Sequence, residues 1–206
     1  MELTGSSYES EDFIEVDLWG KSLSDITFTS CDFAGAGLSE VRTEKVTFTD
    51  CSFVGAELHG SQHRFSSFVN CTFDRTSWHG ATLTGCRLLG STFTSCRLRP
   101  ITLTDCDLSL CSLAGERLMG TDFSGVRLRE ANLTGADLSR CTFAGADLTG
   151  ARAGGAILKD ADLRGARIDT PFWVAAKVVG AKVDIDQALL YAAAHGLVLQ
   201  EPSAER

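Results

Sequence analysis

Hydrophobic positions recur every five residues along this chain. A large apolar side chain stands at almost every fifth position from Leu3 to Val183, with Thr43 and His63 as polar exceptions. Small side chains, including all eight cysteines, stand two residues before it, and seventeen of the twenty glycines stand two residues after it. A helical face recurs at 3.6 residues and a strand face at 2, so neither fits. The pattern predicts a unit that points one large and one small side chain inward and then turns a corner.

The aromatic residues add a second period of twenty. Phenylalanines recur at intervals of twenty residues, which a five-residue period alone would not produce. Four units therefore form one square coil. Successive coils stack at ~4.8 Å, so that the rings form columns. The prediction is an all-β, quadrilateral parallel coil over residues 1–183, with about nine coils at this spacing and a length of roughly 43 Å. Leucine replaces the rings from Leu88 and Leu113 onward. The predicted aromatic core consists of Phe13, Phe28, Phe33, Phe48, Phe53, Phe68, Phe73 and Phe93.

Both ends of such a coil need covers. Asp184 and Gln187 have the spacing of a capping box, apolar residues follow at helical spacing, and Gly196 supplies a stop. We therefore predict a helix from about 185 to 195 within a capping segment 184–196, followed by a tail 197–206. At the other end Glu11 and Lys21 occupy inward small positions. They predict a distorted first coil, and we expect disorder in the first several residues.

Apolar residues near the C-terminal end exceed what two inward positions per unit can bury. Two interpretations remain open at this point: the helix covers them, or they join two chains end to end in a twofold dimer. Two rods joined in this way would reach roughly 90 Å. The candidate interface residues are Phe172, Trp173, Val178, Val179, Ile185, Leu189 and Leu190.

Composition and charge exclude several classes of protein. Hydrophobic residues make up 44% of the 206, and the net charge is −8. No apolar run approaches the ~20 residues of a membrane span, and the first residues lack the features of a signal peptide, so we expect a cytoplasmic protein without membrane contact. The acidic balance argues against direct binding of nucleic acid.

The charge is unevenly distributed. Residues 1–60 hold twelve acids and three bases, which gives −9, whereas residues 61–170 hold eleven acids and thirteen bases, which gives +2. An acidic rod about as wide as a duplex fits a basic DNA channel, although solubility alone also explains acidity. The candidate partner-binding acids are Asp12, Asp17, Asp32, Asp50, Glu57, Asp74, Asp105, Asp107 and Asp122.

No constellation points to catalysis, a metal or a cofactor. The cysteines stand where alanine also stands and form no Cys-x-x-Cys, so they are interpreted as reduced, buried thiols. His59 and His79 lie twenty residues apart and are expected to stack on the surface, without the further ligands of a metal site. His63 and Thr43 are expected to form a polar break in the core, satisfied by hydrogen bonds. No nucleophile, base and orienting acid stand out, so we predict that the chain is not an enzyme.

Four segments carry the motif Ala-Asp/Asn-Leu-X-X, namely residues 131–135, 136–140, 146–150 and 161–165. In these the chain resembles the pentapeptide-repeat proteins, whose fold is a right-handed quadrilateral β-helix with twenty residues per coil. A narrower likeness, to the MfpA-like mycobacterial branch of fluoroquinolone-resistance proteins and their Qnr relatives, covers roughly 61–199 and is looser over 1–60. It rests on segments 61–64, 70–73, 89–91, 96–100, 127–130, 160–165, 183–187 and 192–197.

This resemblance implies a function and an assembly. Its relatives are DNA-mimicking homodimers that bind DNA gyrase, modulate its supercoiling and lessen its poisoning by fluoroquinolones. It favours the C-terminal dimer over the simple cover. The unbroken period leaves no room for the projecting loops of many Qnr proteins. The alternatives are a self-immunity protein or a scaffold for another partner, and a purely structural rod.

Overall fold

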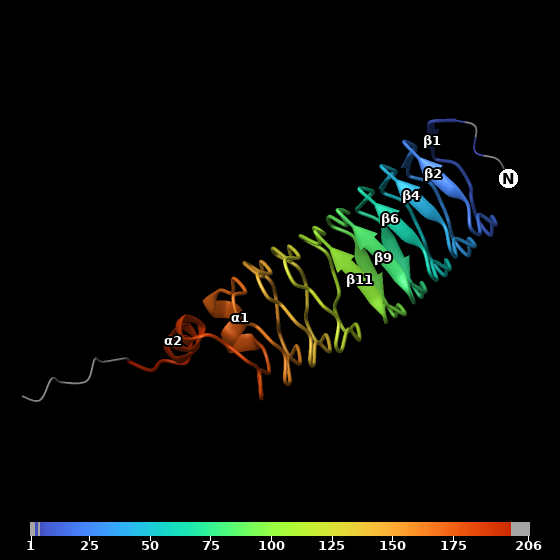
Figure 1. The fold of residues 1–206 in the computed structure, drawn as a ribbon. Coiled ribbons are helices and arrows are strands. Elements are labelled where there is room, and N and C mark those ends of the chain that lie inside the picture. Colours follow the sequence, from blue (N-terminus) through green and yellow to red (C-terminus); the bar gives the residue numbers. More distant parts are fainter. Residues whose placement is uncertain (1–2, 4, 199–206) are drawn as a thin grey trace, which may run out of the picture.

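The chain folds into a straight, square coil with two helices at its C-terminal end (Figure 1). The computed structural model describes residues 3 and 5–198. Successive coils pair in parallel, each pair of residues being twenty positions apart, from Ser7 with Thr27 to Asp162 with Lys182. The predicted right-handed quadrilateral parallel β-helix with a short C-terminal helix is confirmed.

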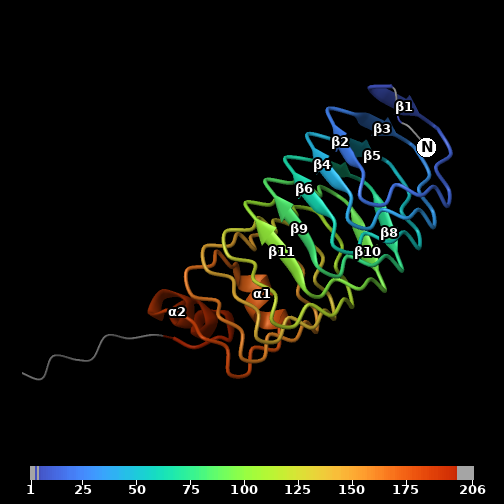
Figure 2. The ribbon, with the colours of Figure 1, turned by 45° about the vertical axis from the view of Figure 1, so that its right-hand side comes forward.

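Three sheets line the N-terminal half of the rod, and Figure 2 shows them on different sides. Their strand orders are β1-β3-β5-β7, β10-β8 and β11-β9-β6-β4-β2. The named strands stop at residue 104, after about five coils at twenty residues each, and single parallel bridges join the coils beyond. The strands are β1 (Ser7–Glu9), β2 (Ser22–Ser24), β3 (Thr27–Thr29), β4 (Arg42–Glu44), β5 (Thr47–Thr49), β6 (Gln62–Arg64), β7 (Ser67–Val69), β8 (Thr72–Asp74), β9 (Ala81–Thr84), β10 (Thr92–Thr94) and β11 (Ile101–Thr104).

Threonine before the large core side chain is common in the strand units, and Asp or Asn at that position occurs in turn units. β3, β5 and β10 have the sequence Thr-Phe-Thr, and β-branched threonine favours an extended backbone. Where Asp or Asn stands there instead, its side-chain oxygen accepts a hydrogen bond from the N–H two residues on, as Asp137 does from Ser139 at 3.1 Å. That bond closes a tight turn, and these units contain no named strand.

The core contains the two predicted columns of rings. Phe33 stacks on Phe53 with ring centroids 5.0 Å apart and planes 6° from parallel. Phe28 stacks on Phe48 with centroids also 5.0 Å apart. Rings of neighbouring columns meet edge to face, as Phe33 and Phe48 do at 80°. Both are favoured aromatic geometries, and all eight predicted core phenylalanines are buried.

The polar break in the core is satisfied as predicted. Thr43 pairs with His63 across one coil, and Thr43 Oγ1 lies 2.8 Å from His63 Nδ1. His63 Nε2 lies 2.9 Å from Ser61 Oγ, and Ser66 Oγ lies 2.9 Å from Thr43 Oγ1. Complete burial of the imidazole lowers the pKa of His63 to about 3. The ring is therefore neutral at physiological pH.

The first coil is regular, so the prediction that it is distorted is wrong. β1 pairs with β3, and Asp12 pairs with Asp32. Glu11 and Lys21 stand at inward positions but are exposed, because the described residues form no coil on the N-terminal side of the first one. The expected disorder of the first several residues concerns in part residues 1–2 and 4, which lie outside the described residues.

Two helices close the C-terminal end. The sequence did not predict α1 (Thr170–Ala175), whose Pro171 stands where preceding coils use an N–H to close the turn, as Ala151 does onto Leu148. Proline has no N–H and suits the first turn of a helix. α2 (Ile185–Ala194) confirms the predicted helix, with the capping box of Asp184 and Gln187 present.

Gln187 seals the last coil. Its amide nitrogen donates to the carbonyl oxygens of Leu163 at 2.6 Å and Ala166 at 2.8 Å, and the side chain is buried. The carbonyl of Leu163 also accepts from the N–H of Ala166 at 3.0 Å, whereas the amide of Gln187 supplies the donor for the carbonyl of Ala166. The polar side chain thus satisfies a group that would otherwise be buried without a partner.

Candidate partner-binding surface

The nine acids predicted to bind a partner lie on all four sides of the rod. The backbone pairs Asp12 with Asp32 on one side. On the next side it pairs Asp17 with Gly37 and Gly37 with Glu57, as predicted. Asp107 and Asp122 belong to the other two sides, at positions paired with Arg127 and Thr142. The structure therefore does not gather these acids into one stripe.

Several of these acids also have a structural task. Five of the nine accept a hydrogen bond from the backbone N–H two residues on, which leaves part of each carboxylate for a partner: Asp12, Asp17, Asp32, Asp107 and Asp122. Asp50 and Asp105 occupy corners with φ of 54° and 52°. Asp74 lies 3.2 Å from the guanidinium of Arg75.

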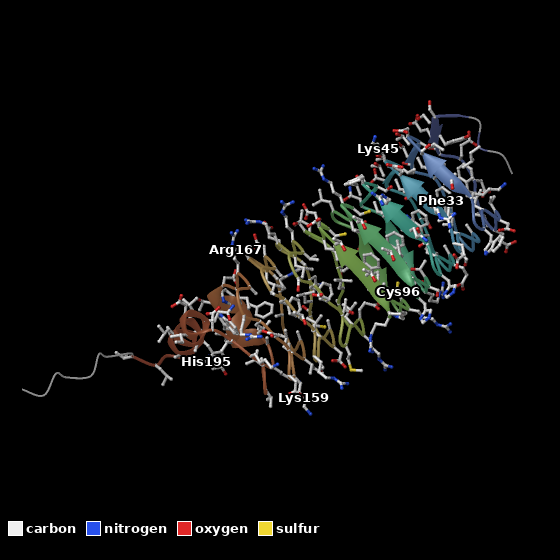
Figure 3. All side chains as sticks on the ribbon, in the orientation of Figure 1. Phe33, Lys45, Cys96, Lys159, Arg167 and His195 are labelled. Carbon is white, nitrogen blue, oxygen red and sulfur yellow. The ribbon has the colours of Figure 1, made fainter. Side chains whose placement is uncertain are left out.

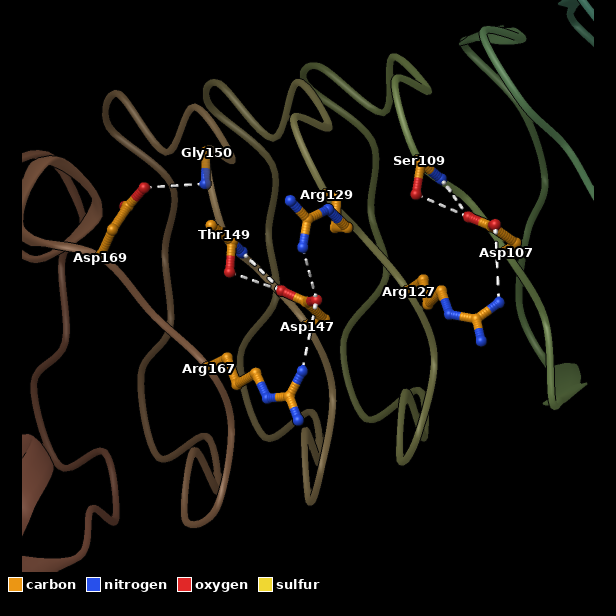
Figure 4. Close-up of polar contacts among 9 residues, drawn as sticks. All are labelled: Asp107, Ser109, Arg127, Arg129, Asp147, Thr149, Gly150, Arg167 and Asp169. Atoms are coloured by element: carbon orange, nitrogen blue, oxygen red, sulfur yellow. Dashed lines mark hydrogen bonds and ion pairs between the residues drawn. The ribbon is translucent and has the colours of Figure 1, made fainter.

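The two halves of the rod differ in how their charges are paired. Within the described part of residues 1–60, no carboxylate lies within 4 Å of a basic nitrogen. One side of the C-terminal half instead carries a column in which the charge alternates, Arg87, Asp107, Arg127, Asp147 and Arg167. Arg127 lies 3.8 Å from Asp107, and Arg167 lies 3.9 Å from Asp147 (Figure 4). This half is largely neutralised by its own side chains.

The hydrogen bonds of this column change the acidity of its carboxylates. Burial opposes ionisation of Asp147, but hydrogen bonds from Thr149 and Arg129 outweigh it and lower the pKa of that carboxyl. On the neighbouring side, hydrogen bonds from Arg164 lower the pKa of Asp162 to about 2. Both groups are therefore held in the charged form by their own neighbours.

The residues predicted to form a dimer divide into two groups. Phe172 and Trp173 are 0% and 1% exposed inside the chain, so their assignment to an interface is wrong: α1 turns them into the core. Val178 is partly buried, whereas the remaining predicted interface residues are exposed. These are Val179, Ile185, Leu189 and Leu190.

The thiols and imidazoles are placed as the sequence predicts. All eight cysteines are free, and all are buried except Cys96, which is intermediate. The rings of His59 and His79 stack with centroids 5.3 Å apart. No group of three or more metal-ligating side chains occurs among residues 3 and 5–198. In the same part of the chain, no helix is long and apolar enough to span a bilayer.

Sequence reasoning missed two features of the charged surface. Glu116 stands at an inward small position and is 4% exposed, burial raises its pKa, and its carboxylate accepts a hydrogen bond from the N–H of Cys96. The alternating column also went unnoticed. Listing every twentieth residue from Arg87 reveals the column. Listing the residue two positions before each large core residue reveals Glu116, which precedes Leu118.

Comparisons with known proteins agree with this architecture. Residues 76–153 match the family model described as a pentapeptide repeat region. No curated protein matches the chain. A trypsin-treated variant of QnrB1, a plasmid-mediated fluoroquinolone resistance protein, superposes with a TM-score of 0.81 at 23% identity over 94% of this chain and 97% of that chain. Full-length QnrB1 gives 0.62 at 22% identity over 93% and 100%. At this level of identity the likeness shows the fold.

Proposed function

On the premise that the chain is a pentapeptide-repeat protein, we propose that it is a non-enzymatic binding protein that occupies the DNA-binding surface of DNA gyrase. There it would modulate supercoiling and protect the enzyme from fluoroquinolones. The single observation that carries the proposal is the acidity of residues 1–60, which hold twelve acids and three bases and whose described carboxylates have no ion-pair partner. The likeness of the fold to a plasmid-mediated fluoroquinolone resistance protein supports the proposal.

Free carboxylates on a narrow rod are suited to a basic channel. A surface that binds DNA does so largely by neutralising phosphates with Lys and Arg, and unpaired carboxylates offer it the same charge. Carboxylates paired with arginines of the same chain offer such a surface much less negative charge, because the arginines already neutralise them. We therefore assign the main contact to residues 1–60 and a lesser role to Asp74 and Asp107, which are paired, and to Asp105 and Asp122, which belong to the segment of net charge +2.

The same proposal includes a homodimer joined at the C-terminal ends. Ile185, Leu189 and Leu190 on α2 are 79%, 46% and 50% exposed, and Val179 beside them is 74% exposed. Exposed apolar side chains gathered at one end are typical of an interface. A twofold dimer through this end would put the two acidic halves at opposite tips. Leu189→Lys should give a monomer of unchanged fold, and a dimer in sedimentation would contradict this interface.

A supercoiling assay with purified gyrase tests the function. Asp12→Asn, Asp17→Asn and Asp32→Asn together remove three charges and keep an amide oxygen to accept each turn hydrogen bond. We expect this variant to lose most of the effect on supercoiling and to associate with gyrase more slowly than the wild type. The association rate of the wild type should fall as salt is added, because salt screens its charges. The matched control carries Asp107→Asn, Asp122→Asn and Asp137→Asn and should retain most of it.

Two outcomes would separate the alternatives. A wild-type protein without any effect on supercoiling, ATPase or drug poisoning at micromolar concentration would exclude gyrase as the target. Capture of a different protein by the wild type, lost in the N-terminal triple variant, would then identify a scaffold or self-immunity role for the same acidic half. Equal losses in both triple variants would show that general acidity, not the N-terminal half, carries the effect.

A further inference from the structure

A groove on one side of the rod collects positive charge on an otherwise acidic molecule. It is lined by Glu57, His59, Ser77, His79, Cys96, Arg97, Leu98, Arg99 and Arg117 and has a volume of about 590 Å³. We call the five basic side chains among them, His59, His79, Arg97, Arg99 and Arg117, the cationic groove. Figure 3 labels Cys96 in this middle part of the rod, where nitrogen-tipped side chains project from its edge.

The two imidazoles of the groove are held in a fixed arrangement. Their rings are 7° from parallel with centroids 5.3 Å apart. His79 Nδ1 donates to the carbonyl oxygen of Arg99 at 2.7 Å, because a carbonyl can only accept. This bond fixes the ring, and no side chain or backbone group of the described residues forms a hydrogen bond with Nε2, which is an acceptor in the neutral ring and a donor in the protonated one. His79 is exposed, so Nε2 is available to a ligand.

The arginines of the groove differ from those of the alternating column. Arg97, Arg99 and Arg117 have no carboxylate within 4 Å among the described residues, whereas Arg127, Arg129 and Arg167 each have one. Arg97 and Arg117 stand at equivalent positions of successive coils, ~4.8 Å apart along the rod. Like charges at that spacing repel each other. An anion between them would remove the repulsion, as Asp107 and Asp147 do in the column.

We propose that the cationic groove binds a small ligand that carries two or more phosphate groups. Guanidinium groups donate paired hydrogen bonds to phosphate oxygens, and three of them supply enough donors for more than one phosphate. The imidazoles add donors when they are protonated. The volume lies in the range of small-molecule sites. The net charge of −9 on residues 1–60 of the same rod repels a long polyanion, so the ligand is a compact phosphate compound and not a nucleic acid.

Calorimetric titration of the full chain with pyrophosphate tests this proposal at low ionic strength. The variant Arg97→Gln with Arg99→Gln removes two charges from the groove. The matched control, Arg127→Gln with Arg129→Gln, removes the same charge from two arginines that are paired with carboxylates. We expect the groove variant to bind pyrophosphate at least about tenfold more weakly, since each lost charged hydrogen bond is worth more than 1 kcal/mol, and the control to bind within about twofold of the wild type.

The remaining arms fix the ligand class. Orthophosphate should bind more weakly than pyrophosphate, and ATP should bind at least as well as pyrophosphate. Tighter binding of a single-stranded oligonucleotide than of either would overturn the proposal, as would equal losses in the two variants or the absence of saturable binding to the wild type. Unfolding midpoints of both variants within a few degrees of the wild type show that a loss of binding is not a loss of fold. If the groove variant unfolds early, His79→Gln replaces it, with the same expected direction.

Discussion

The N-terminal and C-terminal halves of the rod obey one period with different chemistry. The N-terminal coils stack aromatic rings under threonine-rich strands, and the described carboxylates of residues 1–60 have no ion pair. The C-terminal coils stack leucine on leucine and pair charges between coils. Asp turns close units in both parts, as Asp12 and Asp137 show, so the comparison separates closing a turn, which a carboxylate does everywhere, from pairing with an arginine of the next coil, which residues 1–60 lack.

The largest expected effect tests the aromatic half. Phe53 lies between Phe33 and Phe73 with both ring centroids 5.0 Å away, and it is fully buried. Phe53→Ala should lower the free energy of unfolding by about 3–5 kcal/mol, because it removes a ring and leaves a cavity that its stacked neighbours cannot fill. Leu133→Ala is the counterpart in the aliphatic half and should cost about 2–4 kcal/mol. Denaturant unfolding measures both, and a loss under 1 kcal/mol for Phe53→Ala would contradict a stacked column.

The next effect is the pH dependence that His63, in the aromatic core, gives to the free energy of unfolding. Burial lowers the pKa of His63 to about 3, so the folded chain keeps the ring neutral while the unfolded chain protonates it below about 6.5. The free energy of unfolding is therefore greatest above pH 6.5 and falls as the pH decreases toward 3. Between pH 6.5 and 4 the imidazole accounts for a loss of about 3 kcal/mol. His63→Leu should remove that part of the pH dependence, and the exposed His195→Gln should not.

These elements also show which features can be read from the sequence. The stacking of Phe33 on Phe53 and the capping box of Asp184 follow from spacing alone, since a period fixes which side chains meet. α1 did not follow, because its Trp173 keeps the five-residue phase while Pro171 removes the N–H that closes a coil. The stacking of Arg127 on Asp107 also follows from the period of twenty, but the 3.8 Å approach of their charged groups depends on side-chain conformations that spacing does not fix.

A smaller effect separates the two tasks of a carboxylate. Asp137 Oδ1 accepts from both the N–H of Ser139 at 3.1 Å and its hydroxyl at 2.6 Å. Asp137→Ala should cost about 1 kcal/mol through the loss of these bonds, whereas Asp137→Asn keeps an acceptor and should cost a few tenths. Thermal unfolding of the two variants measures the difference. Equal costs would mean that charge, and not the turn, is what the C-terminal half requires of this residue.

The smallest effect concerns the corners, where both halves place residues with positive φ. Leu110 holds φ of 62° with its side chain 53% exposed, a conformation that disfavours any residue with a Cβ. Leu110→Gly should stabilise the fold by about 0.5 kcal/mol after the greater entropy of glycine in the unfolded chain is subtracted. Gly115→Ala is the reverse control: φ is 72°, nothing lies within 4 Å of an added Cβ, and the backbone alone should cost about 1 kcal/mol. Shifts of the same sign in the two variants would show that the corners are set by packing and not by backbone preference.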